Sequence, residues 1–188
     1  MNRKQLIVTS VLVMSILILV ITQGFFNDNF ERINTAEKET SQFTQYKLNV
    51  DDYCIVLPNE WAVKESGSDG YISCELKFTG YNDNITGIVE VINTKENIKA
   101  FAEKDVKNQS LNYSDLNVKL LDNSKMHGIL NEYNTSIKGG NTYKNKCYYL
   151  SLNDEQIVKV LFNIKNTASN KSTDDILEGI ISSIKDSN

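Results

Sequence analysis

The amino-acid sequence predicts an α+β protein in which a single N-terminal transmembrane helix is followed by an antiparallel β-sheet domain with helices packed on it. Three features predict this: an uncharged apolar run near the N-terminus, a series of short alternating segments separated by turn residues, and two segments with helical periodicity. The 188 residues allow one domain and an appendage. Hydrophobic residues make up 40% of the chain and charged residues 23%, so we expect a folded domain.

The apolar run covers residues 6–26 and contains no charged residue. A helix of this length, rising about 1.5 Å per residue, spans the roughly 30 Å hydrocarbon core of a bilayer. Arg3 and Lys4 precede the run and the first acidic residue, Asp28, follows it, so the positive-inside rule places residues 1–5 in the cytoplasm. We therefore expect a single-pass anchor in the cell membrane and an extracytoplasmic C-terminal domain.

A cleaved signal peptide is the alternative for this segment, and it would produce a secreted protein. Its best cleavage motif, Thr-Gln-Gly at residues 22–24, matches the small-x-small rule poorly, which favours the uncleaved anchor. Residues 27–44 are polar and charged without a clear period, so we expect a linker there. The extracytoplasmic domain is then predicted over residues 45–188.

Short strands are predicted in the first half of this domain. Residues 71–78 alternate cleanly, and residues 85–93 are β-branched on both faces, as in a central strand covered on both sides. Strands are also expected at residues 47–50, 53–57 (ended by Pro58) and 61–64.

Two amphipathic helices and a four-strand meander complete the domain. Thr94 is expected to cap the first helix, which ends near Asn108, and Ser172 the second. The apolar stripes of the helices are Ile98, Phe101, Ala102 and Val106 in the first, and Ile176, Leu177, Ile180, Ile181 and Ile184 in the second. The meander strands are residues 118–121, 126–136, 142–152 and 156–164.

This pattern of elements resembles the PsbP-like family, whose fold is that of the extrinsic photosystem II subunit and of many bacterial envelope proteins. The resemblance extends over nearly all of residues 45–188, although Glu60 stands before Trp61 where family members often have glycine. It implies an α/β/α sandwich and a binding or assembly role, and no ligand or metal residue is carried over. The matching segments are residues 57–61, 87–92, 98–106, 128–136 with the following Gly-Gly turn, 148–150, 158–162 and 176–184.

The charge distribution disfavours nucleic acid as a partner. Without Arg3 and Lys4, 18 basic residues face 24 acidic ones, a net charge of −6 for the rest of the chain. Affinity for a phosphate backbone depends on cations that displace counterions. The same balance disfavours docking of the domain on anionic lipid.

The sequence predicts no catalytic, cofactor-binding or metal-binding residues. His127 is the only histidine, so a histidine metal pair cannot form, and we expect it at the surface. The serines lack a Gly-x-Ser-x-Gly elbow, so a Ser-His-Asp triad has no nucleophile context. Asp51 with Asp52, or Asp83 with Glu90, could serve as an acid/base pair or bind calcium, but the D-x-D-x-D-G pattern is absent. Solvated turn and strand charges are the preferred interpretation.

The three cysteines, Cys54, Cys74 and Cys147, have no C-x-x-C spacing and suggest neither a zinc site nor a disulfide framework. Cys74 alternates in phase with its apolar neighbours and is expected to be buried. A Cys54–Cys74 disulfide stays open as an alternative because the domain is predicted to lie outside the cytoplasm.

Aromatic side chains are the candidates for a contact surface. Tyrosine and tryptophan are enriched at interfaces because they join an apolar body to a polar tip. Core or rim positions account for most of them, and Trp61, Tyr81 and Tyr143 are chosen as the contact surface because turns can project them.

These observations predict a membrane-anchored, non-enzymatic binding or accessory module of a bacterial cell envelope, with an envelope protein as its partner and no cofactor. The alternatives are a carboxylate-dependent envelope enzyme and a secreted protein with a cleaved signal peptide.

Overall fold

The computed structural model describes residues 42–50, 53–80, 83–108, 113–123, 126–136 and 140–186. The chain divides into two compact units, Met1–Phe43 and Thr44–Asn188, and the described fold belongs almost entirely to the second. The predicted anchor at residues 6–26 lies outside the described residues. Within the described ranges, no helix has both the length and the apolar character needed to cross a bilayer.

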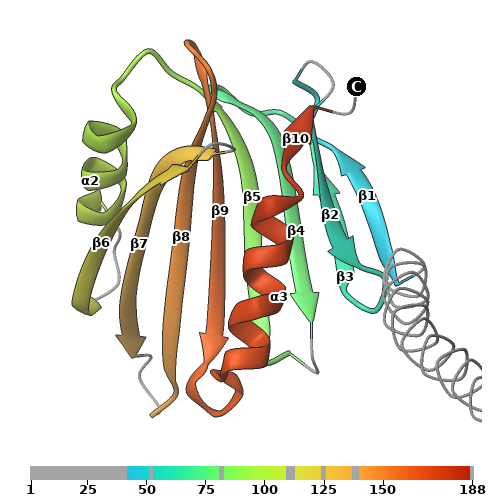
Figure 1. The fold of residues 1–188 in the computed structure, drawn as a ribbon, viewed down its shortest axis with the longest axis vertical. Helices are drawn as coiled ribbons and strands as arrows, with labels where there is room; N and C mark the ends of the chain where they lie inside the picture. Colours follow the sequence, from blue (N-terminus) through green and yellow to red (C-terminus); the bar gives the residue numbers. More distant parts are fainter. Residues whose placement is uncertain are drawn as a thin grey trace, which may run out of the picture. The chain divides into compact units, whose positions relative to one another are not determined.

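Seven antiparallel strands form the main sheet in the order β3-β4-β5-β9-β8-β7-β6 (Figure 1). Two meanders make it up, and the pairing of β5 with β9 joins them. β6 is therefore one edge of the sheet and β3 the other. The strands are β3 (Ala62–Ser66), β4 (Ile72–Gly80), β5 (Ile85–Asn93), β6 (Tyr113–Asn123), β7 (Met126–Ser136), β8 (Thr142–Asn153) and β9 (Gln156–Lys165).

A smaller sheet of three strands has the order β1-β2-β10. Its strands are β1 (Phe43–Lys47), β2 (Tyr53–Pro58) and β10 (Lys185–Asp186). The sequence predicted a strand at residues 47–50, but β1 already ends at Lys47 and residues 48–50 form the turn before β2. In this turn the Leu48 N–H donates to the Tyr53 carbonyl over 3.0 Å. Pro58 ends β2 as predicted.

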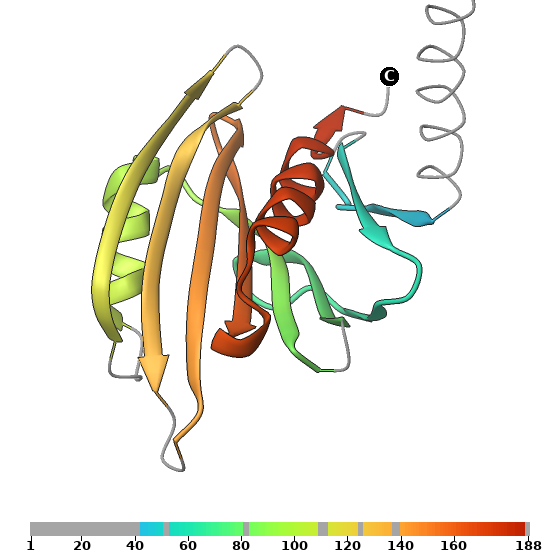
Figure 2. The same cartoon turned by 60° about the horizontal axis from the view of Figure 1, so that its bottom comes forward.

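Helix α2 (Ile98–Asn108) lies on one face of the main sheet, and α3 (Lys171–Ser182) and the small sheet lie on the other (Figure 2). The predicted apolar face of α2 is confirmed, since Ala102 and Val106 are buried. Its cap is Asn97, whose Oδ1 accepts from the Lys99 N–H over 2.9 Å. Thr94 instead accepts from Glu96 in the preceding turn.

Helix α3 follows a short 3-10 turn, η1 (Asn166–Ala168), and its predicted apolar stripe packs into the core. The cap differs from the prediction by two residues. Asn170, not Ser172, has the extended backbone of an N-cap and accepts from the Thr173 N–H over 2.9 Å. Ser172 lies inside the first turn of the helix.

The main core lies between the sheet, α3 and the small sheet. Trp61 belongs to it, with 3% of its surface exposed and its ring stacked on Phe78 at 5.3 Å. The ring occupies the space above Gly80, where a Cβ would overlap it. The choice of Trp61 as a contact residue is thus corrected: tertiary packing across β3 and β4 buries its side chain.

All three cysteines lie within the described ranges and are buried, and none of them is part of a disulfide, so the Cys54–Cys74 bridge is absent. The burial of Cys74 is as predicted. β5 is an interior strand of the sheet, but one of its faces is only partly covered: Thr86, Ile88 and Glu90 are partly exposed.

Candidate functional site: the α2–β6 groove

A groove separates helix α2 from the edge strand β6, and we name it the α2–β6 groove. It encloses a volume of about 110 Å³. Apolar side chains dominate it, with charged side chains of α2 at its rim. The lining comes from α2 (Lys99, Ala102, Glu103, Val106 and Lys107), from β6 (Tyr113, Leu116 and Val118) and from β7 (Ile129 and Asn131).

The groove exists because α2 covers β7 and β8 but stops short of β6. Val118 lies opposite Asn131, and Leu120 opposite Ile129, so these β6 side chains share the face that carries α2. Ile129 is buried there at 3% exposure, whereas its neighbour Leu120 is 76% exposed. Leu116 and Val118 are 42% and 51% exposed. The three β6 side chains form an apolar stripe beside the groove.

Asn131 is the one polar side chain that β7 contributes to the groove lining. It is 2% exposed, and its Nδ2 donates to the Ala102 carbonyl of α2 over 3.4 Å. Its Oδ1 is buried and has no hydrogen-bond partner within the described part of the chain. A buried acceptor in this state costs about 1–3 kcal/mol.

A second, more polar hollow of about 300 Å³ lies along the other side of α2, beside Tyr71, Ile92 and Phe101. Its charged groups already have partners. Lys104 bonds Glu96 at 2.7 Å, and Asp105 bonds Lys159 at 2.9 Å. This hollow is therefore a weaker candidate for a binding site than the α2–β6 groove.

A buried polar cluster anchors α2 to the sheet next to this hollow. Lys159 of β9 contacts Glu90 at 3.3 Å and Asp105 at 2.9 Å, and the Tyr149 hydroxyl donates to Asp105 over 2.6 Å. Burial raises the pKa of Tyr149, and it raises the pKa of the Cys147 thiol to about 12. Both groups stay protonated at neutral pH, so Cys147 lacks the thiolate that cysteine chemistry needs.

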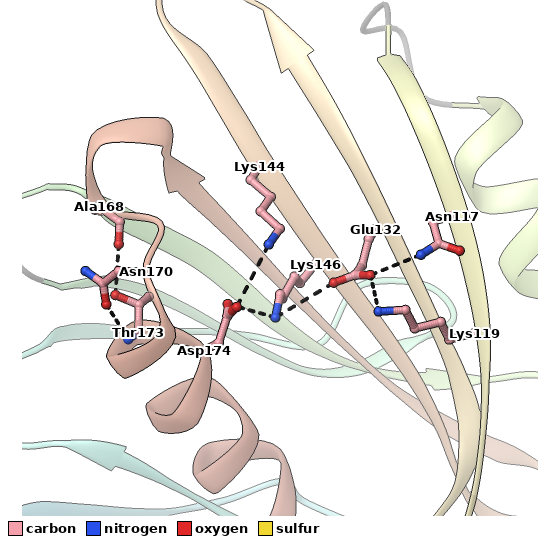
Figure 3. Close-up of polar contacts among 9 residues, drawn as sticks. All are labelled: Asn117, Lys119, Glu132, Lys144, Lys146, Ala168, Asn170, Thr173 and Asp174. Atoms are coloured by element: carbon pink, nitrogen blue, oxygen red, sulfur yellow. Dashed lines mark hydrogen bonds and ion pairs between the residues drawn. The ribbon is translucent and has the colours of Figure 1, made fainter.

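A row of alternating charges crosses the opposite face of the sheet (Figure 3). Lys119 contacts Glu132 at 2.6 Å, and Lys146 contacts Glu132 at 3.8 Å and Asp174 at 2.8 Å. The row links β6, β7 and β8 to the first turn of α3, where a carboxylate also favours the helix dipole. Each of the two carboxylates is paired with two lysines, since Lys144 also lies near Asp174, so this row is suited to holding α3 and not to binding a cation.

Asp83 and Glu90 do not form an acid/base pair. Glu90 bonds Lys159, Asp83 is exposed, and the pair at residues 51–52 lies outside the described residues. His127 is exposed, as predicted, and contacts Asp122 at 2.8 Å. Over the described ranges, no group of three or more metal-ligating side chains occurs.

Of the three predicted contact residues, two lie in the part of the chain that the structure describes. Trp61 is in the core, Tyr143 is partly buried on β8, and Tyr81 lies outside the described residues. Sequence reasoning missed the exposed stripe on β6 and Asn131. The alternation of Leu116, Val118 and Leu120 could have indicated an apolar strand face, but nothing local indicates that no helix covers it.

No model of a known protein family matches the chain, and no curated protein matches it in sequence. Among solved structures, it is similar to cyanobacterial PsbP (CyanoP) from Synechocystis sp. PCC 6803, with a TM-score of 0.58 and 12% identity over 77% of this chain and 92% of that one. A protein of unknown function from Pseudomonas aeruginosa, PA94, matches with a TM-score of 0.46 and 7% identity over 77% and 96% of the two chains. The similarity to CyanoP shows that the domain has a PsbP-like fold, as the sequence pattern predicted.

Proposed function

We propose that this chain is a membrane-anchored, extracytoplasmic and non-enzymatic binding module of a bacterial cell envelope, and that a protein partner docks on the α2–β6 groove. The observation that carries the proposal is the apolar stripe of Leu116, Val118 and Leu120, exposed on an edge strand directly beside a groove. Tethering by residues 6–26 would keep the domain near partners in or at the membrane.

An edge strand with an apolar face is a surface that proteins usually protect. Edges are normally blunted by short length, by charges or by a covering element, because their free backbone groups pair with other chains. β6 has 11 residues and, in the described fold, a single neighbouring strand, β7. A partner segment that extends the sheet at β6 would gain backbone hydrogen bonds and cover the stripe.

The opposite edge provides an internal comparison. β3 has five residues, and Ala62, Lys64 and Glu65 are its exposed ones. It therefore presents a shorter and more polar edge than β6. Partner binding is expected at β6 and not at β3.

Site-specific photo-crosslinking in intact cells tests the proposal. A photoreactive amino acid replaces Leu120 on β6 in one variant and Lys64 on β3 in the other. We expect one dominant adduct from position 120 and none from position 64. A second substitution, Val118→Lys, should abolish the adduct while leaving thermal unfolding unchanged within a few degrees. Equal adducts at both edges, or an adduct that survives Val118→Lys, would refute docking at the groove.

A further inference from the structure

We infer that the partner that docks at β6 is a second copy of this chain, and that the two β6 strands pair antiparallel about a two-fold axis at Val118. This inference rests on the proposed docking at β6 and names the partner. It starts from the order of the exposed apolar side chains along the strand.

The apolar stripe is symmetric about its middle residue. Leu116 and Leu120 lie two positions on either side of Val118, and all three side chains are exposed. An antiparallel pair centred on Val118 places this residue opposite its own copy and Leu116 opposite Leu120 of the second copy. Each apolar side chain then covers another one, and such cross-strand pairs stabilise a sheet. A two-fold interface requires a self-complementary surface of this kind.

The backbone around Val118 is open to pairing. β6 ends the described sheet on one side, with β7 as its neighbour (Figure 1). Lys119 is the only charged residue from position 116 to position 121, and its Nζ contacts Glu132 at 2.6 Å on the face opposite the stripe. The face that carries the stripe therefore lacks, over these positions, the charges that usually protect an edge strand.

Two neighbouring registers fit less well. Moving the axis to Lys119 would place the two lysines directly opposite each other, and it would set Leu116 against Asp122. Like charges in this position destabilise a pair of strands. Moving the axis to Asn117 would set Leu120 against Ser114, beyond the point where the β6–β7 register shifts.

The charges also agree with the register centred on Val118. On the face opposite the stripe, this register sets Lys119 against Asn117 of the second copy, so no two lysines meet. The Asn117 Nδ2 donates to Glu132 over 3.4 Å, and Glu132 also bonds Lys119. Each Lys119 thus faces a neutral amide and keeps the carboxylate of its own chain.

The proposed anchor makes a short interface sufficient. The stripe contains three side chains, so the pairing contributes few contacts. Confinement of both copies to one membrane raises their effective concentration, as a linker does for two joined modules. Every tethered copy also brings the same strand, which a different partner would have to match.

Single cysteines on β6 test the pairing and its register. Cα atoms directly opposite each other lie about 4.5–5.5 Å apart, within disulfide range, whereas an offset of four residues separates them by about 14 Å. Membranes that contain the full chain are treated with a mild oxidant. We expect Val118→Cys to form a covalent dimer of twice 21.3 kDa. Leu116→Cys or Leu120→Cys alone should stay monomeric, and the two variants expressed together should form the dimer.

Two controls give the background. Lys64→Cys lies on the opposite edge, and the unmodified chain carries only its three buried cysteines, so neither should form a dimer. The substituted β6 positions are exposed, and thermal unfolding should change by no more than a few degrees. The inference is wrong if Val118→Cys and the mixed pair both stay monomeric. Equal dimer yields from all single β6 variants would also overturn it, because random collision has no register.

The mass of the photo-crosslinked adduct at position 120 separates this inference from the proposed function. An adduct of two copies of the chain supports both. An adduct with a different protein would leave docking at the groove in place and overturn the second copy as the partner. The absence of any adduct, together with no cysteine dimer, would overturn docking at β6 itself.

Discussion

Glu132 shows how a single carboxylate holds a half-exposed sheet face together. Its Oε2 forms an ion pair with the Lys119 Nζ at 2.6 Å, and its Oε1 lies 3.8 Å from the Nζ of Lys146, whose side chain is only 5% exposed. Burial raises the pKa of Glu132, but the hydrogen bond from Lys119 and the positive charges nearby outweigh burial, so the pKa lies below its ordinary value. The ionised form is therefore the one that stabilises the fold.

The sign of this shift predicts a pH dependence of stability. A carboxylate with a depressed pKa contributes fully above the ordinary glutamate value of about 4.5 and loses that contribution as the pH falls through the depressed value. We expect Glu132→Gln to lower the free energy of unfolding by about 1–2 kcal/mol at pH 7. The difference from the unmodified chain should shrink below about pH 4.5.

Urea unfolding at pH 7, 5, 4 and 3 measures this dependence. Asp154→Asn, in the exposed turn between β8 and β9, is the matched control and should change stability by less than about 0.5 kcal/mol. A Glu132→Gln difference that stays constant from pH 7 to pH 3 would show that the ionised carboxylate of Glu132 does not stabilise the fold.

The burial of a residue was predictable where it follows from alternation along its own strand, and unpredictable where it depends on contacts with another strand. Cys74 alternates with apolar neighbours on one strand, so its burial could be predicted from residues 71–78. Trp61 follows a turn residue and has no such pattern. Its burial depends on Phe78 and on the absence of a side chain at Gly80, both on the neighbouring strand.

At the scale of elements, the start of α3 shows why cap positions are hard to predict. Asn170, Ser172 and Thr173 all have cap-forming side chains, and the choice between them depends on backbone conformation. Asn170 is extended, and its Oδ1 reaches the Thr173 N–H. The Thr173 hydroxyl in turn donates to the Ala168 carbonyl over 2.8 Å, which fixes the turn before the helix.

This geometry predicts unequal effects of two alanine substitutions. Asn170→Ala removes the capping acceptor and should cost about 1 kcal/mol of stability. Ser172→Ala, inside the first turn, should change stability by less than about 0.5 kcal/mol because alanine is the better helix former. Chemical denaturation of both variants at pH 7 measures the pair. A larger cost for Ser172→Ala would contradict Asn170 as the cap.

The elements of the main sheet could be predicted individually, but their order could not. Alternation is local, so the strand at residues 126–136 was predicted at its observed bounds, β7. The position of β6 at an edge follows from the pairing of β5 with β9, which joins residues more than sixty positions apart. The groove beside β6 results from that order and from where α2 lies, so the sequence alone contained no local sign of it.

At the scale of the whole molecule, the α+β class and the packing of helices on an antiparallel sheet could be predicted, while the small sheet could not. β10 contains two residues, and it pairs Lys185 with Cys54 from the other end of the domain. So short a strand has no recognisable period. Its pairing brings the C-terminal end of the domain against β2, the second strand after the predicted linker.

Docking at β6 in the envelope requires the domain to stay tethered outside the cytoplasm, and this location can be tested. An uncleaved anchor predicts that the chain isolated from membranes keeps its full mass of 21.3 kDa. It should resist extraction by alkaline carbonate, and protease added to protoplasts should digest the domain. A cleaved signal peptide predicts a chain that begins near Phe25 and appears in the medium.

A charge placed in the run distinguishes a spanning helix from other causes of membrane association. Lysine at the centre of a transmembrane helix costs about 2.5–3.5 kcal/mol on insertion scales, so Ile16→Lys should reduce the carbonate-resistant fraction sharply. Gln5→Lys, just before the run, adds the same charge on the cytoplasmic side and should leave that fraction unchanged. If both variants stay carbonate-resistant, the domain itself or its partner holds the protein at the membrane. The groove on β6 would then be the first surface to test for that contact.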